Sequence, residues 1–436
     1  MSKKQISIFW FRRDLRLHDN HGLYEALKSE EAVLPIFIFD KDILEGLKDK
    51  ADKRVAFIHQ TLSEINDALK KSGASLCVLH DTPQHAFEKM TNEFEITAVY
   101  TNHDYEPYAI KRDAAVETFL KSKKISFHPF KDQVIFEKDE VVKADGSPYT
   151  VYTPYSKRWK EQYLTDKKTN YPSEKHISNF YKTKPFPFPS LKDLGFESVR
   201  IDISPTTPDK NSIQHYDETR NLPYIDGTSK MSVHLRFGTV SIRELAALAS
   251  KWNAQWLNEL IWREFFMMIL WHFPNVVTES FKSKYDRIPW RNNEIEFRKW
   301  CDGETGYPMV DAGMRELNAT GLMHNRVRMV VASFLTKHLL IDWRWGEAYF
   351  AEKLLDYELS SNNGNWQWCA GCGCDAAPYF RIFNPSEQQK KFDPDMIYIR
   401  KWIKNYKPGY LDPIVDHDFA RKRALGVFKS ALSEAT

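Results

Sequence analysis

The sequence lacks the signatures of several large classes of protein. No apolar run approaches the roughly 20 residues that a membrane-spanning helix requires, so no membrane association is expected. No Gly-x-Gly-x-x-Gly fingerprint follows a strand, which disfavours a nicotinamide dinucleotide site. The N-terminus leads straight into a strand pattern, so a cleaved signal is not expected either.

The chain also has few cysteines and a nearly balanced number of acidic and basic residues. The five cysteines form no regular framework, which indicates a reducing compartment and predicts a cytoplasmic protein. Cys369, Cys372 and Cys374 are close in sequence, but no matching Cys or His pair accompanies them. We therefore predict no metal site there and favour small packing residues in a Gly-rich turn. The 62 basic and 59 acidic residues leave a net charge of +3, so any surface for nucleic acid must be local.

Aromatic residues, in contrast, are abundant. The chain holds 13 Trp and 14% aromatic residues, and most of the Trp lie beyond residue 250. Packing alone does not usually demand so many indole rings.

Residues 1–130 alternate between two patterns. Short apolar or β-branched runs occur at 6–11, 33–39, 75–80, 98–101 and 126–130, with helical patterns at 54–72, 83–94 and 107–121. This alternation predicts a Rossmann-like parallel sheet covered by helices, with any ligand at the carboxyl ends of the strands. A structural domain without a ligand of its own is an equally open interpretation.

The rest of the chain divides into a linker and a helical domain. Residues 131–205 are rich in Pro, Lys, Tyr and Ser, which predicts a long interdomain linker. The aromatic and basic residues at 152–159 could contact an anionic partner, although a solvated linker is favoured. From 206 to 436 the periodicity is helical, at 241–254, 256–273, 295–302, 308–320, 325–340 and 346–355. We therefore predict an α/β domain, a linker and an all-α domain.

One stretch, Asp356 to Pro385, has an unusual mixture of residues. It combines acids, paired Asn, two Trp and a run of small residues. Small residues allow close approach of the backbone to a large flat molecule, amides and acids supply hydrogen bonds, and Trp supplies a stacking face. A Gly-rich loop between two core helices is the alternative.

Three further segments carry candidate binding residues. The run at 227–232 is rich in small hydroxyl residues and could cradle phosphates, although an ordinary loop is favoured for so short a motif. On a helix, Glu259, Trp262 and Arg263 share one face, either as a platform for a heteroaromatic ring or as a core Trp beside a solvated ion pair. Asn325, Arg328 and Met329 likewise share one side, and Arg328 could pair with Asp356. His324, just before them, is favoured as a capping or core residue.

Together these segments resemble the DNA photolyase and cryptochrome family, and most of all its class I cyclobutane pyrimidine dimer photolyases. The matching segments are FWFRRDLRLHDN at 9–20, GTSKMS at 227–232, WLNELIWREF at 256–265, TGYPMVDAGMREL at 305–317, MHNRVRM at 323–329 and NNGNWQWCAGCGCDAAPYFRIFNP at 362–385. The resemblance implies light-driven repair of UV-damaged DNA, in which photoexcited reduced FAD transfers an electron to the dimer. A cytoplasmic monomer is expected.

The resemblance also implies which residues bind FAD in the helical domain. The matching positions are Tyr216, Thr228, Ser229, Lys230, Met231, Ser232, Trp256, Arg263, Arg328, Asp356, Tyr357, Glu358 and Asn362. The run at 228–232 matches the phosphate contacts. Arg328 and Asp356 match the ion pair beside the isoalloxazine ring, and Asn362 matches the residue that faces flavin N5.

The remaining matches concern DNA and electron transfer. The pocket for the dimer is matched by Glu259, Trp262, Asn325, Met329 and Trp368, and the DNA contacts by Arg220 and Arg326. A lesion must be flipped out of the duplex to enter such a pocket, for which photolyases are a standard example. The electron-transfer chain from flavin to surface is matched by Trp366, Trp343 and Trp290.

Several alternatives follow from the same resemblance. A cryptochrome photoreceptor without repair activity is disfavoured by Asn362, where plant cryptochromes typically carry Asp, by the intact dimer pocket and by the absence of a long C-terminal tail. A (6-4) photolyase would typically carry a His pair where this chain has His324 and Asn325. An antenna chromophore (a folate, a deazaflavin or a flavin) would bind the N-terminal domain, but its identity is open. Glu106 matches the acid of folate-binding members, whereas residues 275–278 offer no counterpart of their lysine.

Overall fold

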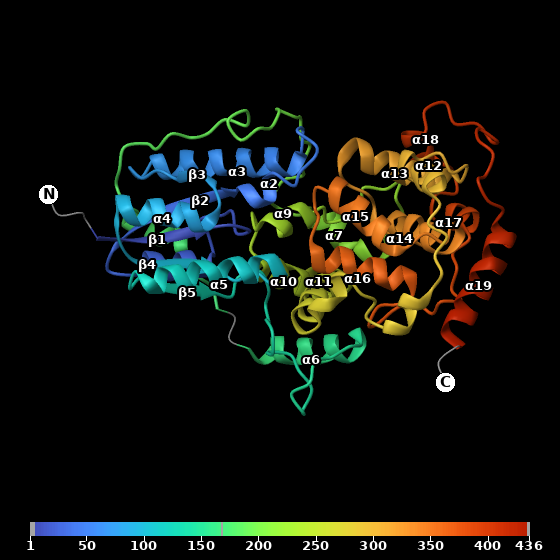
Figure 1. Cartoon of the computed structure of the whole chain (residues 1–436), viewed down its shortest axis with the longest axis horizontal. Coiled ribbons are helices and arrows are strands. Elements are labelled where there is room, and N and C mark those ends of the chain that lie inside the picture. Colours follow the sequence, from blue (N-terminus) through green and yellow to red (C-terminus); the bar gives the residue numbers. More distant parts are fainter. Residues whose placement is uncertain (1–4, 167–168, 434–436) are drawn as a thin grey trace. The chain divides into compact units, whose positions relative to one another are not determined.

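The chain folds into two compact units that alternate along the sequence (Figure 1). A computed structural model describes residues 5–166 and 169–433. The first unit comprises residues up to 137 together with 162–207 and 231–248, and the second comprises 138–161, 208–230 and everything from 249 onward. The predicted domain bounds at 130 and 205 stay a prediction.

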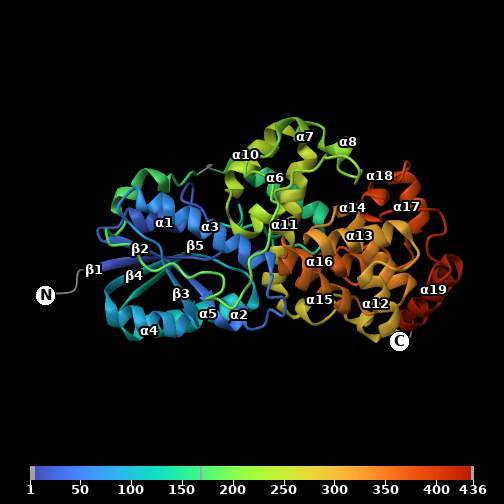
Figure 2. The same ribbon diagram turned by 90° about the horizontal axis from the view of Figure 1, so that it is seen from above.

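The first unit is built around a parallel sheet, as the alternating pattern predicted. Its five strands are β1 (Gln5–Phe11), β2 (Ala32–Asp40), β3 (Cys77–Asp81), β4 (Glu95–Asn102) and β5 (Ser126–Phe130), in the order β3-β2-β1-β4-β5. Each neighbouring pair is parallel. The central strand β1 is buried from Ile6 onward, because helices cover both faces of the sheet (Figure 2).

Helices lie on both faces of the sheet (Figure 2). The helices of this unit include α1 (His21–Leu27), α2 (Lys41–Leu44), α3 (Lys53–Lys70), α4 (Pro83–Glu93) and α5 (Pro107–Ser122). Helix α9 (Ser232–Phe237) belongs to the same unit. Pro83 and Pro107 occupy first helical positions, where the missing N–H costs no hydrogen bond. Ile8, Trp10 and Phe87 belong to the core between sheet and helices.

The second unit is helical and supplies the longer part of the chain. Its main helices are α11 (Ala254–His272), α12 (Glu294–Asp302), α13 (Pro308–Thr320), α14 (Asn325–Ser333), α15 (Trp343–Lys353), α16 (Leu359–Ala370), α17 (Pro385–Phe392), α18 (Ile397–Trp402) and α19 (His417–Ser433). Short helices α7 (Lys210–Gln214) and α8 (Tyr216–Thr219) precede them. Helix α10 (Ile242–Trp252) crosses the division between the units. The predicted α/β and helical architecture is confirmed.

The segment 131–205 differs from a plain solvated linker. Helix α6 (Tyr152–Thr165) and a 3₁₀ helix, η1 (Ser173–Asn179), lie within it. Phe180 forms a parallel bridge with Val33 of β2 and is 1% exposed. The many prolines suggested an exposed connection, but buried aromatic side chains such as Phe180 and Trp159 anchor the segment to the folded units.

Two other predictions of secondary structure need correction. The pattern at 325–340 predicted one helix, but α14 ends at Ser333 and a π-helical turn, η4 (Phe334–His338), follows. The alternative of a Gly-rich loop is wrong for residues 359–370, which form helix α16. Gly371, with a φ of 91°, ends that helix in the left-handed conformation.

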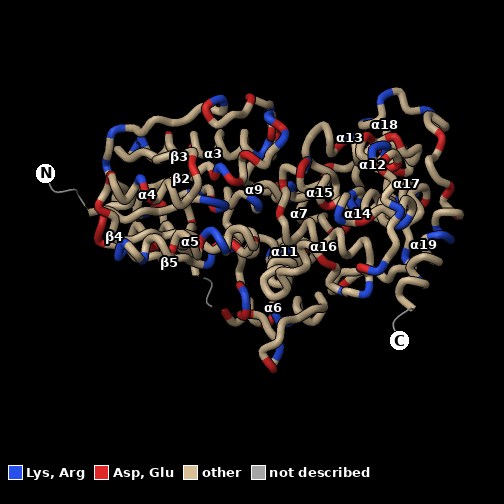
Figure 3. Tube along the Cα trace, in the orientation of Figure 1, with Lys and Arg blue, Asp and Glu red and all other residues tan. Residues whose placement is uncertain are grey.

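Charges of both signs alternate along the trace of each unit, in keeping with the small net charge (Figure 3). In the part of the chain that the structure describes, no helix is both long and apolar enough to cross a membrane.

Candidate functional site: a cavity in the helical unit

Helices α14, α15 and α16 surround a cavity in the second unit. It contains about 550 Å³ of space outside protein atoms, part of it open to solvent. Its lining residues are Asn325, Arg328, Met329, Ala332, Phe350, Leu354, Asp356, Glu358, Ser361, Asn362, Asn365, Trp366 and Cys369. The predicted common side of Asn325, Arg328 and Met329 therefore faces one cavity with the acids and amides of the stretch from 356 onward.

An ion pair forms part of the cavity wall. Arg328 donates to both carboxylate oxygens of Asp356, at 2.9 and 3.1 Å, and also to the Met323 carbonyl at 2.8 Å. The Asp356 side chain is only 4% exposed, so the carboxylate depends on this partner. Removing one member of such a pair leaves a buried charge uncompensated.

The helix that presents Arg328 begins with a histidine cap. The Nδ1 atom of His324 accepts a hydrogen bond from the Arg326 backbone N–H at 3.2 Å, which fits the favoured interpretation of His324 as a capping residue. Burial, reinforced by the charges of Arg326 and Arg328, lowers the pKa of His324 from 6.5 to about 4. Burial and the neighbouring His417 lower the pKa of His338 to about 3.

These two histidines predict a loss of stability in acid. A buried neutral His binds a proton in the unfolded chain at a pH where the folded chain resists it, so its contribution is full above pH 6.5 and disappears as the pH falls toward the folded pKa. For His324 this amounts to about 2 kcal/mol between pH 6.5 and roughly pH 5. Thermal unfolding of His324→Asn, which keeps a capping side chain, should depend less on pH over this range than that of the wild type. Exposed His128 on β5 offers the control: a His128→Asn variant that flattened the pH dependence equally would contradict the assignment.

Asn362 is held in one orientation by helix α15. Its Nδ2 group donates to the backbone carbonyl of Glu347 at 3.1 Å and to the Glu347 carboxylate at 2.8 Å. Both amide hydrogens are thereby used, so the side chain offers its Oδ1 oxygen as an acceptor. Burial raises the pKa of Glu347.

The three residues on one face of α11 have separate partners. Glu259 accepts hydrogen bonds from Arg220 and, at 2.8 Å, from Gln255. Arg263 forms an ion pair with Glu358 at 3.2 Å. Glu259, Trp262 and Arg263 do not line the cavity described above. Glu358, the partner of Arg263, does line it.

Trp262 contacts a residue that the sequence analysis placed in the linker. The Tyr152 ring stacks on Trp262 with centroids 3.6 Å apart and planes 5° apart. The Tyr152 hydroxyl donates to the Asn258 carbonyl at 2.9 Å, and its backbone N–H donates to Asp375 at 2.8 Å. The interpretation of residues 152–159 as solvated linker is therefore wrong for Tyr152. The aromatic residues at 152–159 were the available signal, but nothing in them identifies Trp262 as the partner.

Other predicted residues lie apart from the cavity lining. Trp256 is 1% exposed and stacks on Trp252 at 6.4 Å, whereas Trp368 is half-buried at the edge of the core. Arg326 donates to Asn221 at 2.7 Å and lies 4.4 Å from the centroid of Phe392. The remaining ones are Tyr216, beside the Arg220 guanidinium at 5.7 Å, and Tyr357, packed against the core.

The predicted phosphate run has a mixed environment. Lys230 adopts a φ of 54° and pairs with Asp226 at 2.7 Å. Thr228 and Ser229 are partly buried, Met231 is buried, and Ser232 begins α9. Because Lys230 ends a segment of the second unit and Met231 begins one of the first, the phosphate role of this run stays a prediction.

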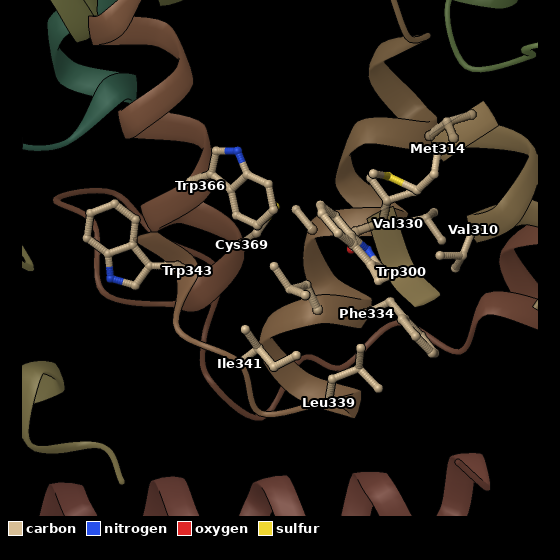
Figure 4. Close-up of a cluster of buried hydrophobic side chains, with 14 of the residues drawn as sticks. Trp300, Val310, Met314, Val330, Phe334, Leu339, Ile341, Trp343, Trp366 and Cys369 are labelled. Carbon is tan, nitrogen blue, oxygen red and sulfur yellow. The ribbon is translucent and has the colours of Figure 1, made fainter. Parts of the chain in front are cut away.

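The tryptophans predicted to carry electrons differ in burial. Trp366 is 2% exposed and Trp343 is 1% exposed, whereas Trp290 is half-buried and packs against Phe428 at 5.8 Å. Figure 4 shows Trp366, Trp343 and Trp300 in one buried cluster. Trp366 also lines the cavity, so it joins the two features.

Cys77, Cys301, Cys369 and Cys372 are buried, and Cys374 is half-buried. Within the described residues, no group of three or more His, Cys, Asp or Glu could hold a metal ion. Cys369 and Cys372 lie near Lys337, whose Nζ donates to the Ala370 carbonyl at 2.7 Å. Burial lowers the pKa of Lys337 to about 7.

The first unit carries its own polar cluster at the carboxyl end of β4. Glu106 pairs with Arg13 at 2.9 Å and with Arg236 at 3.1 Å, and Arg13 also contacts Asp104 at 3.2 Å. The acid that matches folate-binding members is therefore held by two guanidinium groups.

These features define a class of protein with a parallel α/β unit and a helical unit that encloses a polar cavity beside a cluster of Trp rings. The family model described as the FAD binding domain of DNA photolyase matches residues 256–408, and the model described as DNA photolyase matches residues 7–173. The chain belongs to the DNA photolyase family.

Individual relatives match along nearly the whole chain. A deoxyribodipyrimidine photo-lyase of Halobacterium salinarum is 36% identical over 98% of this chain and 99% of its own length. A bacterial class III photolyase of Agrobacterium tumefaciens has a TM-score of 0.85 at 31% identity, covering 99% of this chain and 98% of that one.

Two further solved structures show how broadly the fold is shared. An archaeal photolyase of Sulfolobus tokodaii with two FAD molecules has a TM-score of 0.84 at 32% identity, covering 97% of this chain and 99% of its own. A cryptochrome of Synechocystis has a TM-score of 0.84 at 25% identity, covering 98% and 100%. The fold is therefore shared by proteins named photolyase and by one named cryptochrome.

Proposed function

We propose that this protein is a light-driven repair enzyme that splits cyclobutane pyrimidine dimers in UV-damaged DNA. The observation that carries the proposal is the cavity of the helical unit, in which Arg328, Asp356 and Asn362 converge beside Trp366. Bound FAD in its reduced, photoexcited form supplies the electron that opens the dimer, while the protein supplies position and electrostatics. Class I is the subclass proposed, from the segments quoted above.

The polar groups of the cavity fit a flavin ring. Arg328 and Asp356 are fixed by each other, so they present a cation and an anion without the cost of ordering two free side chains. Asn362 presents only an acceptor oxygen, because Glu347 occupies both of its amide hydrogens. Flavin N5 carries a hydrogen only when the ring is reduced, so an acceptor oxygen set against N5 would favour the reduced form needed for repair.

A neutral side chain at this position also matters for charge. An Asp in place of Asn362 would add a carboxylate close to buried Glu347 and Asp356, and like charges in a low-dielectric site repel strongly. The amide accepts a hydrogen bond without adding that negative charge to the cavity.

Glu259 can bind the lesion without losing its present partners. Both of its hydrogen bonds, from Arg220 and Gln255, end on Oε1. In the described part of the chain, no hydrogen bond reaches Oε2, so this oxygen can accept from an imide N–H of a pyrimidine ring. The hydrogen bond from Arg220 holds the carboxylate in place.

Trp262 supplies the apolar contact in the proposed lesion pocket. Its ring is partly exposed and one face rests on Tyr152, which fixes the orientation of the indole. A flipped-out dimer needs such a rigid surface, because base-to-aromatic stacking contributes about 1–3 kcal/mol per base. Arg326 is the proposed contact for a neighbouring phosphate.

The test of this function is repair of an oligonucleotide that carries one thymine cyclobutane dimer. The chemically reduced protein is illuminated with blue light, and a second sample stays in darkness. Light-dependent recovery of intact thymines supports the proposal. Protein that retains FAD and photoreduces it, yet repairs nothing, would instead be a cryptochrome, the second candidate that the Synechocystis structure keeps open.

Substitution of Tyr152 is expected to impair repair through Trp262. In Tyr152→Ala the stacking partner is lost and the indole gains rotamers, so lesion affinity should fall by about tenfold, corresponding to roughly 1.4 kcal/mol for an aromatic pair. Tyr152→Phe keeps the ring and loses only the hydroxyl bond to Asn258, so it should stay within a fewfold of wild type. Binding of dimer-containing DNA, measured by fluorescence anisotropy with the FAD content as a check, distinguishes the two. Equal loss in both variants would contradict a role for the ring.

A further inference from the structure

The Trp cluster extends beyond the predicted electron-transfer chain. The indole of Trp366 contacts Trp300 with centroids 6.1 Å apart at 69°. Trp300 comes from α12 and is 0% exposed, and its N–H donates to the Val331 carbonyl at 3.1 Å. A second indole is thus in ring contact with the Trp that lines the cavity.

Trp300 in turn contacts a tyrosine at the edge of the core. The centroid of Tyr349, on α15, lies 5.8 Å from that of Trp300 at an angle of 65°. Tyr349 is half-buried, and its hydroxyl donates to Asn318 at 2.6 Å. Two ring contacts therefore lead from Trp366 to a phenol near solvent.

Packing alone does not explain the choice of these side chains. Phe350 and Phe297 occupy adjoining positions in the same cluster, at 6.1 and 5.8 Å from Trp300. Indole and phenol rings lose an electron far more readily than a phenyl ring. The oxidisable rings form the continuous series, and the phenyl rings lie beside it.

We infer that Trp300 and Tyr349 form a second route by which oxidised Trp366 recovers its electron. The inference rests on the proposed function, because photoexcited oxidised FAD is the oxidant that takes an electron from Trp366. One electron then passes from Trp300 to Trp366, and one passes from Tyr349 to Trp300. Tyr349 is left one electron short and releases its phenolic proton to water, so charge and protons balance.

The hydrogen bonds of the two residues suit different positions in this route. The Trp300 N–H is locked onto a backbone carbonyl in the core, so its oxidised ring cannot release a proton to water and acts as a relay. Burial raises the pKa of Tyr349, so the phenol is fully protonated before it reacts. An oxidised phenol is strongly acidic, and the half-buried hydroxyl can lose its proton, which makes Tyr349 the end of the route.

The predicted chain has charged groups beside Trp343. The guanidinium of Arg344 lies 4.7 Å from the centroid of Trp343, where a positive charge disfavours an oxidised ring. Asp286 and Asp342 pair with Arg344 at 2.5 and 3.2 Å, so two carboxylates face this one guanidinium group.

The test places variants in a Trp343→Phe background, where the predicted chain is interrupted. Blue flashes are applied to protein with oxidised FAD and no DNA, and radicals are followed by transient absorption and electron paramagnetic resonance. Trp343→Phe should form a neutral tyrosyl radical and keep slow photoreduction. Adding Tyr349→Phe should abolish that radical and slow photoreduction about tenfold further, the effect of roughly 1.4 kcal/mol in the barrier. Adding Trp300→Phe should do the same.

Controls separate this inference from the proposed function. Tyr406→Phe, added to the same background, removes a half-buried tyrosine that contacts Tyr410 instead, and should leave the radical unchanged. A tyrosyl radical that persists after Tyr349→Phe, or none in Trp343→Phe alone, would overturn the branch. Repair by chemically reduced protein is measured alongside, since the proposed function fails only if that repair is absent.

Discussion

Replacing Glu259 by alanine should lower repair of a cyclobutane dimer by about 10- to 100-fold while FAD stays bound. The physical reason is the loss of a charged acceptor, since a hydrogen bond to an ionised group contributes about 1.5–3 kcal/mol. Arg220, which is 20% exposed, can be rehydrated when its partner is removed, so the fold should tolerate the change. The measurement is the yield of repaired oligonucleotide per photon absorbed by reduced enzyme, with flavin absorbance as the check on cofactor content.

Two further variants sharpen this test. Glu259→Gln keeps the shape and one acceptor oxygen but removes the charge, so its repair yield should lie between wild type and Glu259→Ala. Arg220→Ala leaves the carboxylate and removes the cation that aims it, which should weaken DNA binding and its dependence on salt. An unchanged yield in Glu259→Ala would exclude this carboxylate from the lesion pocket.

The first unit could be predicted well because its signals are local. Each strand is a short apolar run, and the helices between strands begin at Pro83, Pro107 or an Asp cap such as Asp52. Such features act within a few residues of one another, so they can be recognised without knowledge of the tertiary fold.

The segment that could not be predicted as helix is the one closest to the candidate site. Helix α16 contains Asn362, Asn363, Gly364 and Asn365, which are poor helix formers. Tertiary packing overrides that preference: a Cβ atom at Gly364 would lie 2.2 Å from the Phe266 ring, so the glycine permits close contact between α16 and α11. Residues of low helix propensity occur in α16 because the cavity requires polar side chains and close packing there.

Contacts between residues far apart in the chain also could not be predicted from the sequence. The spacing on α11 correctly placed Glu259, Trp262 and Arg263 on a helix, but it could not identify Arg220, Tyr152 and Glu358 as their partners. The pair of Arg328 and Asp356 is the exception, since opposite charges in two unusual segments suggested it.

Several of the Trp residues gather in one region of the helical unit. Trp366, Trp343 and Trp300 belong to a single core beside the cavity, and the half-buried Trp290 and Tyr349 lie at its margins. A core of oxidisable rings with more than one electron-transfer route to the surface would let the enzyme restore reduced FAD after accidental oxidation. These electron-transfer routes serve photoreduction and not the repair step, so mutation of the rings can separate photoreduction from repair.

Trp343→Phe should therefore slow photoreduction of oxidised FAD strongly while repair by already reduced enzyme is spared. A barrier increase of only about 1.4 kcal/mol slows a step tenfold, and a phenyl ring in place of an indole raises the barrier by more than that. Phe fills most of the indole space at a position that is 1% exposed, and the indole N–H has no hydrogen-bond partner to lose within the described structure. The fold and the FAD content should thus be preserved.

The measurement compares two rates on the same protein sample. Photoreduction is followed by the bleaching of oxidised flavin under blue light with an external thiol, and repair is followed after chemical reduction. The matched control is Trp402→Phe, which removes a partly buried indole at the end of α18 that has no predicted role in electron transfer. If Trp343→Phe reduced both rates equally, Trp343 would act through the structure of the site rather than as an electron carrier. If photoreduction were unchanged, the route through Trp300 and Tyr349 would have to carry the full flow of electrons.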